Sequence, residues 1–330
     1  MTIAPRLKEN IWHIHIEEAT SSLFTTQGEY QVPTEDALKF MKIRPYCNGH
    51  NSIEKIARLS GLSESETTEM LAALEEISLL AKDSTEPLSI EVVRGKLIKI
   101  TDIWSQELKL GYIANDLPEG NLPKTTLIGW LLEMYHYIKD FPLAIGSAIK
   151  SVEASNPDLA VLLEKYSNEE MGHEMFVLNT LENMGFSTEE VITSEPLPST
   201  KLIGFMMRDM FEKHPLSVLL MAALVEAQEF DADNIKIFQE NLEKKYKLPQ
   251  AAMAPYFKHQ EIDNNLGHSQ LLSNNLHLFR EINEPTLDAI INKLHDLKHA
   301  FELQSLEIKH YYSDLSGKYF PRQPIKYTSI

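Results

Sequence analysis

Length, charge and cysteine content narrow the classes of protein to which this chain of 330 residues can belong. It is long enough for two domains, and its formal net charge of -17 opposes binding to the phosphates of nucleic acids. With one cysteine, no signal peptide pattern and no apolar run near the roughly 20 residues that cross a bilayer, the sequence predicts a cytoplasmic protein without a membrane partner.

The N-terminal part of the chain has short elements of both kinds. Residues 11–16 alternate with a period of two, which predicts a strand, and residues 23–32 predict a second strand pair. Helical patterns follow, and two of them begin at the capping residues Ser52 and Ser63. Strands with three short helices predict a small α+β winged-helix domain over residues 1–85.

The third of these helices does not have the charge of a DNA-reading helix, which carries basic residues into the major groove. It has no Lys or Arg, and its acidic residues are Glu64, Glu66, Glu69, Glu75 and Glu76. The pattern from Ile11 to Ala81 resembles the winged-helix domain of the pyrroloquinoline-quinone chaperone (PqqD-like) type. That resemblance implies binding of a leader peptide, and a structural or dimerising role is the alternative.

The rest of the chain is predicted to be mainly α. Residues 86–103 are expected to form a linker that includes some strand, because residues 90–100 are strand-like. From residue 104 to residue 330 the pattern is helical, with prolines between the segments. This organisation predicts a bundle of seven helices.

The stretch from Leu163 to Gly185 is predicted to be one amphipathic helix with an ionisable pair on its apolar stripe. Glu170 and His173 are three residues apart, so they share a face. A buried charge needs a partner, and Glu-x-x-His is a pattern by which helical bundles bind iron or manganese. A hydrogen-bonded core pair is the alternative.

Two further segments offer metal-binding side chains. Glu226 follows the apolar run 216–225, and it either binds a cation or turns to solvent. His259 and Asp263 are four residues apart and share a helical face, where an imidazole and a carboxylate suit Fe(II). A solvated polar face is the alternative for this pair.

Together, Glu170-x-x-His173, Glu226 and His259-x-x-x-Asp263 resemble the ordered ligand motifs of heme-oxygenase-like diiron oxidases. The family relates to heme oxygenase, the TenA thiaminases and the pyrroloquinoline-quinone synthase oxidase, and the resemblance covers residues 104–312. It implies two Fe(II) ions with O2 as co-substrate.

The chain departs from the family pattern at Leu266, where the last histidine is expected. A π-turn near Gly267 would bring His268 beside Asp263 and complete the ligand set. The alternative register places Glu261, Asn265 and His268 on one face.

A second Glu-x-x-His lies upstream. Glu133, His136 and Tyr137 belong to a segment that resembles the aromatic first long helix of the family. We expect these residues to line a substrate pocket or to support the metal ligands, with core hydrogen bonding as the alternative.

The resemblance implies an O2-dependent non-heme iron oxidase or oxygenase that acts on an amino acid, amine or peptide in natural-product biosynthesis. We expect a small-molecule or peptide substrate and a homodimer. The alternatives are a metal-free enzyme like TenA or the pyrroloquinoline-quinone synthase, and a non-catalytic binding protein.

Overall fold

The computed structural model describes residues 4–8, 13–25, 28–81, 86–111, 113–225, 232–279 and 281–329. The chain divides into two compact units, Met1–Ser84 and Thr85–Ile330. No described helix combines the length and apolar composition needed to span a bilayer.

The N-terminal unit contains an antiparallel sheet of three strands in the order β1-β2-β3. The strands are β1 (His13–His15), β2 (Thr20–Thr25) and β3 (Gly28–Pro33), and three helices follow: α1 (Thr34–Ile43), α2 (Ile53–Ser60) and α3 (Glu64–Glu76). The buried core includes Leu23, Phe40, Ile56 and Leu74. This small α+β unit is consistent with the predicted fold class, and its assignment as a winged helix stays a prediction.

The caps predicted for two of its helices are confirmed. The Ser52 side chain accepts a hydrogen bond from the Lys55 backbone N–H. Ser63 and Glu66 form the reciprocal capping box at the start of α3. Each cap satisfies backbone donors that the first turn of a helix leaves unpaired, so the local sequence fixes where α2 and α3 begin.

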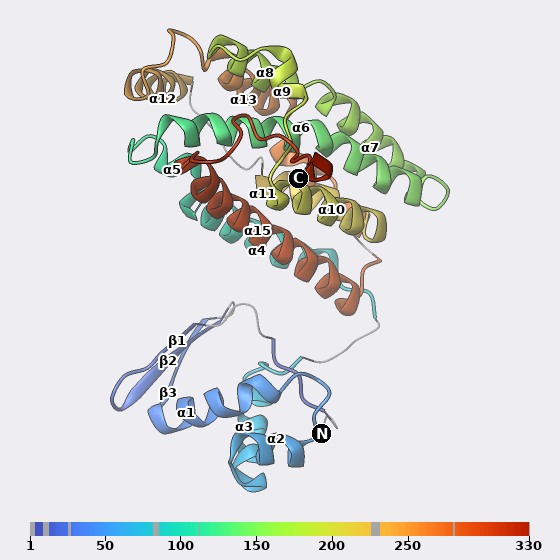
Figure 1. Ribbon diagram of the computed structural model, residues 1–330. Helices are drawn as coiled ribbons and strands as arrows, with labels where there is room; N and C mark the ends of the chain where they lie inside the picture. Colours follow the sequence, from blue (N-terminus) through green and yellow to red (C-terminus); the bar gives the residue numbers. More distant parts are fainter. Residues whose placement is uncertain are drawn as a thin grey trace. The chain divides into compact units, whose positions relative to one another are not determined.

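The second unit is mainly helical (Figure 1). Its longer helices are α4 (Ile90–Gly111), α6 (Lys124–Val152), α7 (Pro157–Glu170), α8 (Glu174–Asn183), α10 (Pro198–Lys213), α11 (Ser217–Val225), α12 (Ala232–Lys245), α13 (Ala254–Leu266) and α15 (Glu284–Ser313). Short helical pieces connect them: α5 (Ile113–Asp116), α9 (Thr188–Ile192), α14 (Leu271–Asn274) and the 3₁₀ turns His268–Gln270 and Leu276–Phe279.

Helix α6 is the central element of this unit. It packs against α7, α8, α10 and α15, and its apolar residues are buried on most sides, as a helix surrounded by others requires. Pro142 lies inside α6, so this proline does not separate two helices as the sequence pattern indicated. After α15 the chain returns to the segment before α10, where the Arg322 guanidinium donates a hydrogen bond to the Pro196 carbonyl.

The predicted linker at residues 86–103 is wrong. Residues 90–103 belong to α4, and its side chains Val93 and Leu97 are fully buried in the core of the helical unit. These two residues are four apart, which is the spacing of one helical face, so tertiary packing overrides the β-branched composition that indicated strand.

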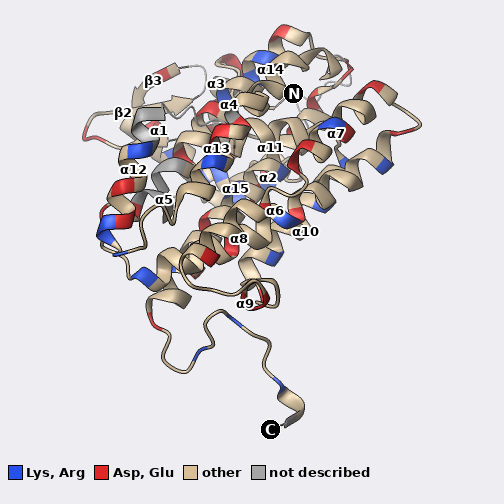
Figure 2. Ribbon diagram, turned by 90° about the horizontal axis from the view of Figure 1, so that it is seen from above, with Lys and Arg blue, Asp and Glu red and all other residues tan. Residues whose placement is uncertain are grey.

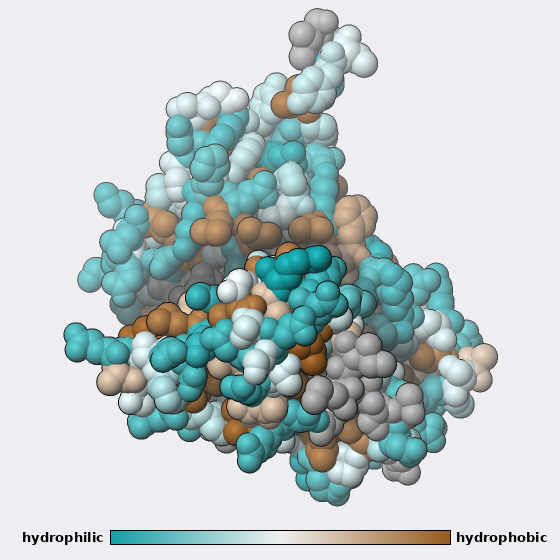
Figure 3. All heavy atoms as spheres, turned by 90° about the horizontal axis from the view of Figure 1, so that it is seen from below, coloured by the Kyte–Doolittle hydropathy of each residue, from teal (hydrophilic) through white to brown (hydrophobic). Residues whose placement is uncertain are grey.

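The surface has mixed character. Acidic and basic residues occur on many helices (Figure 2). On the face shown in Figure 3, apolar residues lie in small groups among hydrophilic ones. Such scattered exposure is ordinary for folded proteins.

Candidate metal centre

Glu170 and His173 lie at a break between two helices, which corrects the prediction of one continuous helix. Helix α7 ends at Glu170, and α8 begins at Glu174. Between them Gly172 has a φ of 90°, a left-handed conformation that side chains larger than hydrogen disfavour. The turn keeps both ligand candidates inside, because Glu170 is 5% exposed and His173 is 7% exposed.

Helix α13 and the turn that follows it supply His259, Asp263 and His268. His259 and Asp263 lie on α13, which packs beside α8 (Figure 1). Helix α13 ends at Leu266, Gly267 adopts a φ of 73°, and a 3₁₀ turn starts at His268. The predicted π-turn is therefore wrong, and a left-handed glycine that ends the helix turns His268 inward instead. His268 is 1% exposed, whereas Leu266 is 42% exposed.

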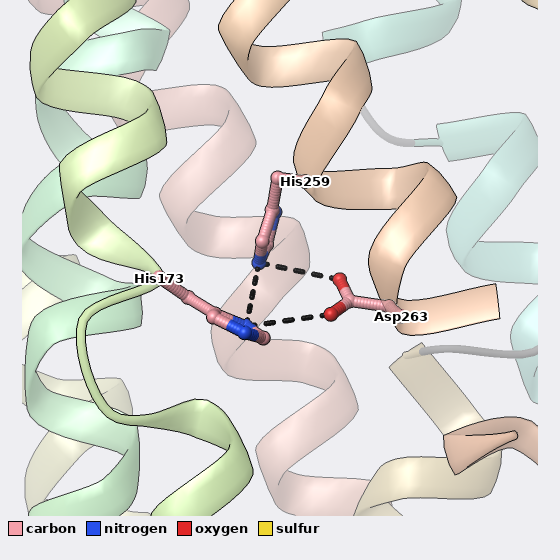
Figure 4. Close-up of side chains that lie close together, drawn as sticks. All are labelled: His173, His259 and Asp263. Atoms are coloured by element: carbon pink, nitrogen blue, oxygen red, sulfur yellow. Dashed lines mark hydrogen bonds and ion pairs between the residues drawn. The ribbon is translucent and has the colours of Figure 1, made fainter. Parts of the chain in front are cut away.

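The first group of atoms that could bind a metal, called a metal-binding group below, consists of two imidazoles and one carboxylate (Figure 4). His173 Nδ1 and His259 Nε2 are 3.1 Å apart. The Asp263 carboxylate faces both, with Oδ1 3.3 Å from His173 Nδ1 and Oδ2 3.2 Å from His259 Nε2. Three potential ligand atoms thus converge on one point between α8 and α13.

A second group shares Asp263 with the first. Ligand atoms of Glu170, Asp263 and His268 lie within 4.8 Å of one another. Glu170 Oε1 is 3.0 Å from His268 Nδ1, yet this buried oxygen accepts no hydrogen bond. Burial of a carboxylate oxygen that accepts no hydrogen bond costs free energy unless a cation binds that oxygen.

Glu169 is a residue of the site that the sequence pattern did not indicate. Its Oε2 lies 3.3 Å from His268 Nε2, on the side of the imidazole opposite to the Nδ1 that faces Glu170. On a regular helix Glu169 and Glu170 point about 100° apart, so only the fold around His268 lets both contact one ring. The ring of Tyr166 also packs edge-on against His268, 4.7 Å away.

The pKa values of the group follow from burial and from its mutual contacts. Burial alone would raise the pKa of Glu170, but the close imidazoles of His173 and His268 lower it to about 2. Burial lowers the pKa of His259 to about 4, and charge on His173 acts in the same direction. At neutral pH Glu170 is therefore ionised and His259 is neutral, which are the forms that bind a cation.

Glu133 lies away from the metal-binding groups, in a buried network of hydrogen bonds. Its carboxylate accepts from the Leu197 backbone N–H at 2.9 Å, from the Thr200 hydroxyl at 2.6 Å and from the Tyr312 hydroxyl at 2.7 Å. Leu197 and Thr200 are at the N-terminus of α10, where a carboxylate is favourable. Burial raises the pKa of Glu133, and these three donors oppose that effect.

The other two predicted pocket residues do line a cavity. His136 and Tyr137 contribute to a cavity between α6 and α10. The cavity contains neither Glu133 nor any member of the metal-binding groups. Glu226, the remaining predicted ligand, lies outside the described residues, directly after the end of α11.

Comparison with known proteins agrees with the fold and with the chemistry of this centre. A family model described as iron-containing redox enzyme matches residues 128–294, which is just over half of the chain. The chain belongs to this family of iron-containing redox enzymes. The matched segment includes every residue of the two metal-binding groups.

Solved structures give the architecture. A domain of unknown function with a heme oxygenase-like fold from Shewanella denitrificans OS217 is similar, with 17% identity, a TM-score of 0.55 and coverage of 72% of this chain and 99% of that one. A TenA homologue from P. horikoshii OT3 has 15% identity, a TM-score of 0.45 and coverage of 68% and 99%, and is too distant to add to the argument. No curated protein matches the chain. The helical unit thus has a heme oxygenase-like fold.

Proposed function

We propose that the chain is an O2-dependent non-heme iron oxidase or oxygenase with two iron ions in one centre. The observation that carries this proposal is the position of the Asp263 carboxylate, which belongs to both metal-binding groups. A carboxylate has two oxygens and can bind one cation with each, as in carboxylate-bridged two-metal centres. Asp263 would therefore be a ligand common to two neighbouring ions.

The donor set fits iron. Three imidazoles and two carboxylates combine nitrogen and oxygen ligands. This mixture suits Fe(II), whereas Mg²⁺ and Ca²⁺ prefer sites made of oxygen ligands alone. The buried Glu170 Oε1, which accepts no hydrogen bond, is a position that a cation would satisfy. His173, His259 and Asp263 would hold one ion, and Glu170, Asp263 and His268 the other, with Glu226 as a further ligand by family resemblance.

Two Fe(II) ions in this centre would supply the electrons with which O2 is activated for attack on a C–H bond or an amine. Glu169 Oε2 accepts a hydrogen bond from the Nε2–H group of His268, which would leave Nδ1 of that ring to bind the metal. The Phe176 ring stacks against His259 at 5.7 Å and shields it from solvent.

The proposal is tested by the metal content of the full-length protein after anaerobic reconstitution with Fe(II). We expect about two iron ions per chain in the wild type, and at least one fewer in Asp263→Asn, because that variant weakens both groups at once. Glu261→Gln is the matched control on the same helix, since Glu261 is exposed and paired with Lys258. Consumption of O2 should need bound iron.

Two outcomes would contradict the proposal. If wild-type protein binds no iron, the metal-free enzyme or the binding protein described above becomes the better explanation. If Asp263→Asn retains the iron content of Glu261→Gln, Asp263 is not a shared ligand. Circular dichroism of each variant establishes that the fold is kept.

For the N-terminal unit we propose peptide binding, which a specific cavity favours. A cavity of about 310 Å³ opens between the sheet and helices α1 and α3, and its apolar lining includes Leu23, Val32, Phe40, Met70, Leu74 and Ile77. Strand β3 is at the edge of the sheet, so its backbone can pair with an extended peptide while the cavity accepts apolar side chains.

A display library of random peptides, selected on the full-length protein, would test this second proposal. Selected peptides should lose binding in Met70→Glu, because Met70 lines the cavity. They should keep binding in Met41→Glu, because Met41 is 46% exposed and is not part of the lining. Equal binding to both variants would place the peptide elsewhere.

A further inference from the structure

A second cavity lies in the helical unit, apart from the metal centre. It has a volume of about 320 Å³ and lies between α6 and α10, a size at the lower end of small-molecule sites. The rings of Phe141 and Tyr166 form a continuous series between Tyr137, which lines the cavity, and His268 of the metal centre. The cavity is therefore separated from the centre by packed aromatic side chains.

The charge of this cavity is opposite to that of the whole chain. The sequence has 48 acidic and 31 basic residues, but the charged residues that line the cavity are Lys139, Lys201 and Arg208 against Asp140 alone. Such a local excess of positive charge attracts anions even when the net charge of the protein repels them.

One of the three cations is available to a ligand. Arg208 is paired with Asp140, and Lys201 is paired with Glu195 at 2.6 Å. Among the described residues, the Lys139 ammonium has no carboxylate partner; its contacts are the Tyr135 hydroxyl at 3.5 Å and the Tyr135 ring at 5.4 Å. An anionic group in the cavity would give Lys139 a charged partner.

His136 contributes a neutral imidazole whose proton position follows from its neighbours. The Ser194 hydroxyl donates to the Val191 carbonyl at 2.7 Å, so it accepts from His136 Nε2 at 2.8 Å. The proton is therefore on Nε2, and Nδ1 is left as an acceptor. Burial lowers the pKa of His136 to about 4, so the ring is uncharged at neutral pH.

The walls of the cavity are apolar and partly open to water. Phe205 is 66% exposed and Leu143 is 58% exposed, although both line the cavity together with Tyr137. A ligand with an aromatic or aliphatic body would cover these side chains and gain the free energy of removing them from water. The site combines this apolar surface with one available cation.

We propose that the cavity between α6 and α10 binds a small organic carboxylate with an apolar body, its carboxylate paired with Lys139 and its body against Phe205 and Leu143. This site is distinct from the metal centre and does not depend on the iron proposal. It would give the protein a second small-molecule ligand, as either a co-substrate or an effector.

The probe for this site is 3-phenylpropionate, with the neutral 3-phenylpropanamide as its matched comparison. Titration of full-length, metal-free protein by ligand-observed NMR should give a Kd on the order of 1 mM, a value usual for a ligand of this size. The amide should bind about tenfold more weakly, because it lacks the charge that Lys139 would pair with. The protein is used without metal so that the carboxylate of the probe cannot bind to iron in the metal centre.

Variants of the cavity residues test whether the probe binds in this cavity. Lys139→Gln should weaken 3-phenylpropionate about tenfold and leave the amide unchanged, and Phe205→Ser should weaken both. Lys150→Gln, which changes an exposed lysine farther along α6, should change neither. Equal binding of acid and amide, an unchanged affinity in Lys139→Gln, or no binding at 10 mM would each overturn the proposal.

Discussion

Gly129 of α6 is the position where the packing of the helical unit can be tested most sharply. A Cβ atom at residue 129 would overlap the ring of Tyr312 on α15. Gly146 lies on the same helix, and a Cβ atom there would meet nothing within 4 Å. The substitution to alanine is chemically the same at both positions, so the difference between them reports the contact of α6 with α15.

The expected changes in the free energy of unfolding are opposite in sign for the two substitutions. Alanine is more favourable than glycine inside a helix by about 1 kcal/mol, so Gly146→Ala should stabilise the protein by up to that amount. At residue 129 the same gain is opposed by overpacking, which costs about 1–3 kcal/mol. Displacement of the Tyr312 ring also weakens its 2.7 Å hydrogen bond to Glu133, which contributes about 1.5–3 kcal/mol when the acceptor is charged. The net destabilisation of Gly129→Ala is therefore about 1.5–5 kcal/mol.

The assay is urea unfolding followed by tryptophan fluorescence in a Trp12→Phe background, so that the signal comes from Trp104 and Trp130, which are both buried in the core of the helical unit. A lower midpoint at unchanged slope would report lost stability rather than a changed unfolded state. If Gly129→Ala were as stable as Gly146→Ala, Tyr312 would not be held against α6, and the described Glu133 network would be wrong.

Three further predictions concern the two sites. Glu169→Ala should weaken metal binding about 10- to 100-fold, as loss of a partner behind a ligand histidine does; chelator competition measures this, and Glu164→Ala on the exposed side of α7 should have no effect. Leu266→His should leave the iron content unchanged, because residue 266 faces solvent; an added iron in metal analysis would show that the helix continues past Leu266. The third prediction uses the pKa of His136, about 4 in the folded protein against an ordinary 6.5. Stability from the neutral ring is complete above pH 6.5 and is lost as the pH falls towards 4, so from pH 7 to pH 5 the free energy of unfolding should fall by about 2 kcal/mol more in wild type than in His136→Gln. Equal losses in the two proteins would show that His136 is not buried as a neutral ring.

Sequence patterns indicated five residues that the structure brings into the two groups of potential metal ligands, but not the backbone that presents them. Glu170 and His173 were expected on one face of a regular helix, and the structure brings them together across a turn at Gly172. A single glycine inside a helical pattern is compatible with a continuing helix and with a helix end. The choice depends on packing between α7, α8 and α13, which the local sequence does not contain.

The same ambiguity applies to His268. By helical spacing it belongs to the face opposite His259, and only the left-handed Gly267 reverses this. Glu169 had no sequence signal of its own, because its role exists only once His268 is in place. In contrast, the starts of α2 and α3 were predictable, since the Ser52 and Ser63 caps involve residues within one turn.

The single cysteine allows the opening of the N-terminal unit to be measured by thiol labelling, and the helical unit has no cysteine. Cys47 is 2% exposed and lies in the small core of residues around Phe40 and Ile43. A thiol reagent reaches a buried sulfur only when the surrounding structure opens, so the labelling rate of native protein measures the free energy of that opening. Because no other residue of the chain carries a thiol, intact mass spectrometry counts one label per opened N-terminal unit. The same reaction with a bound peptide would show directly how much that peptide slows the opening.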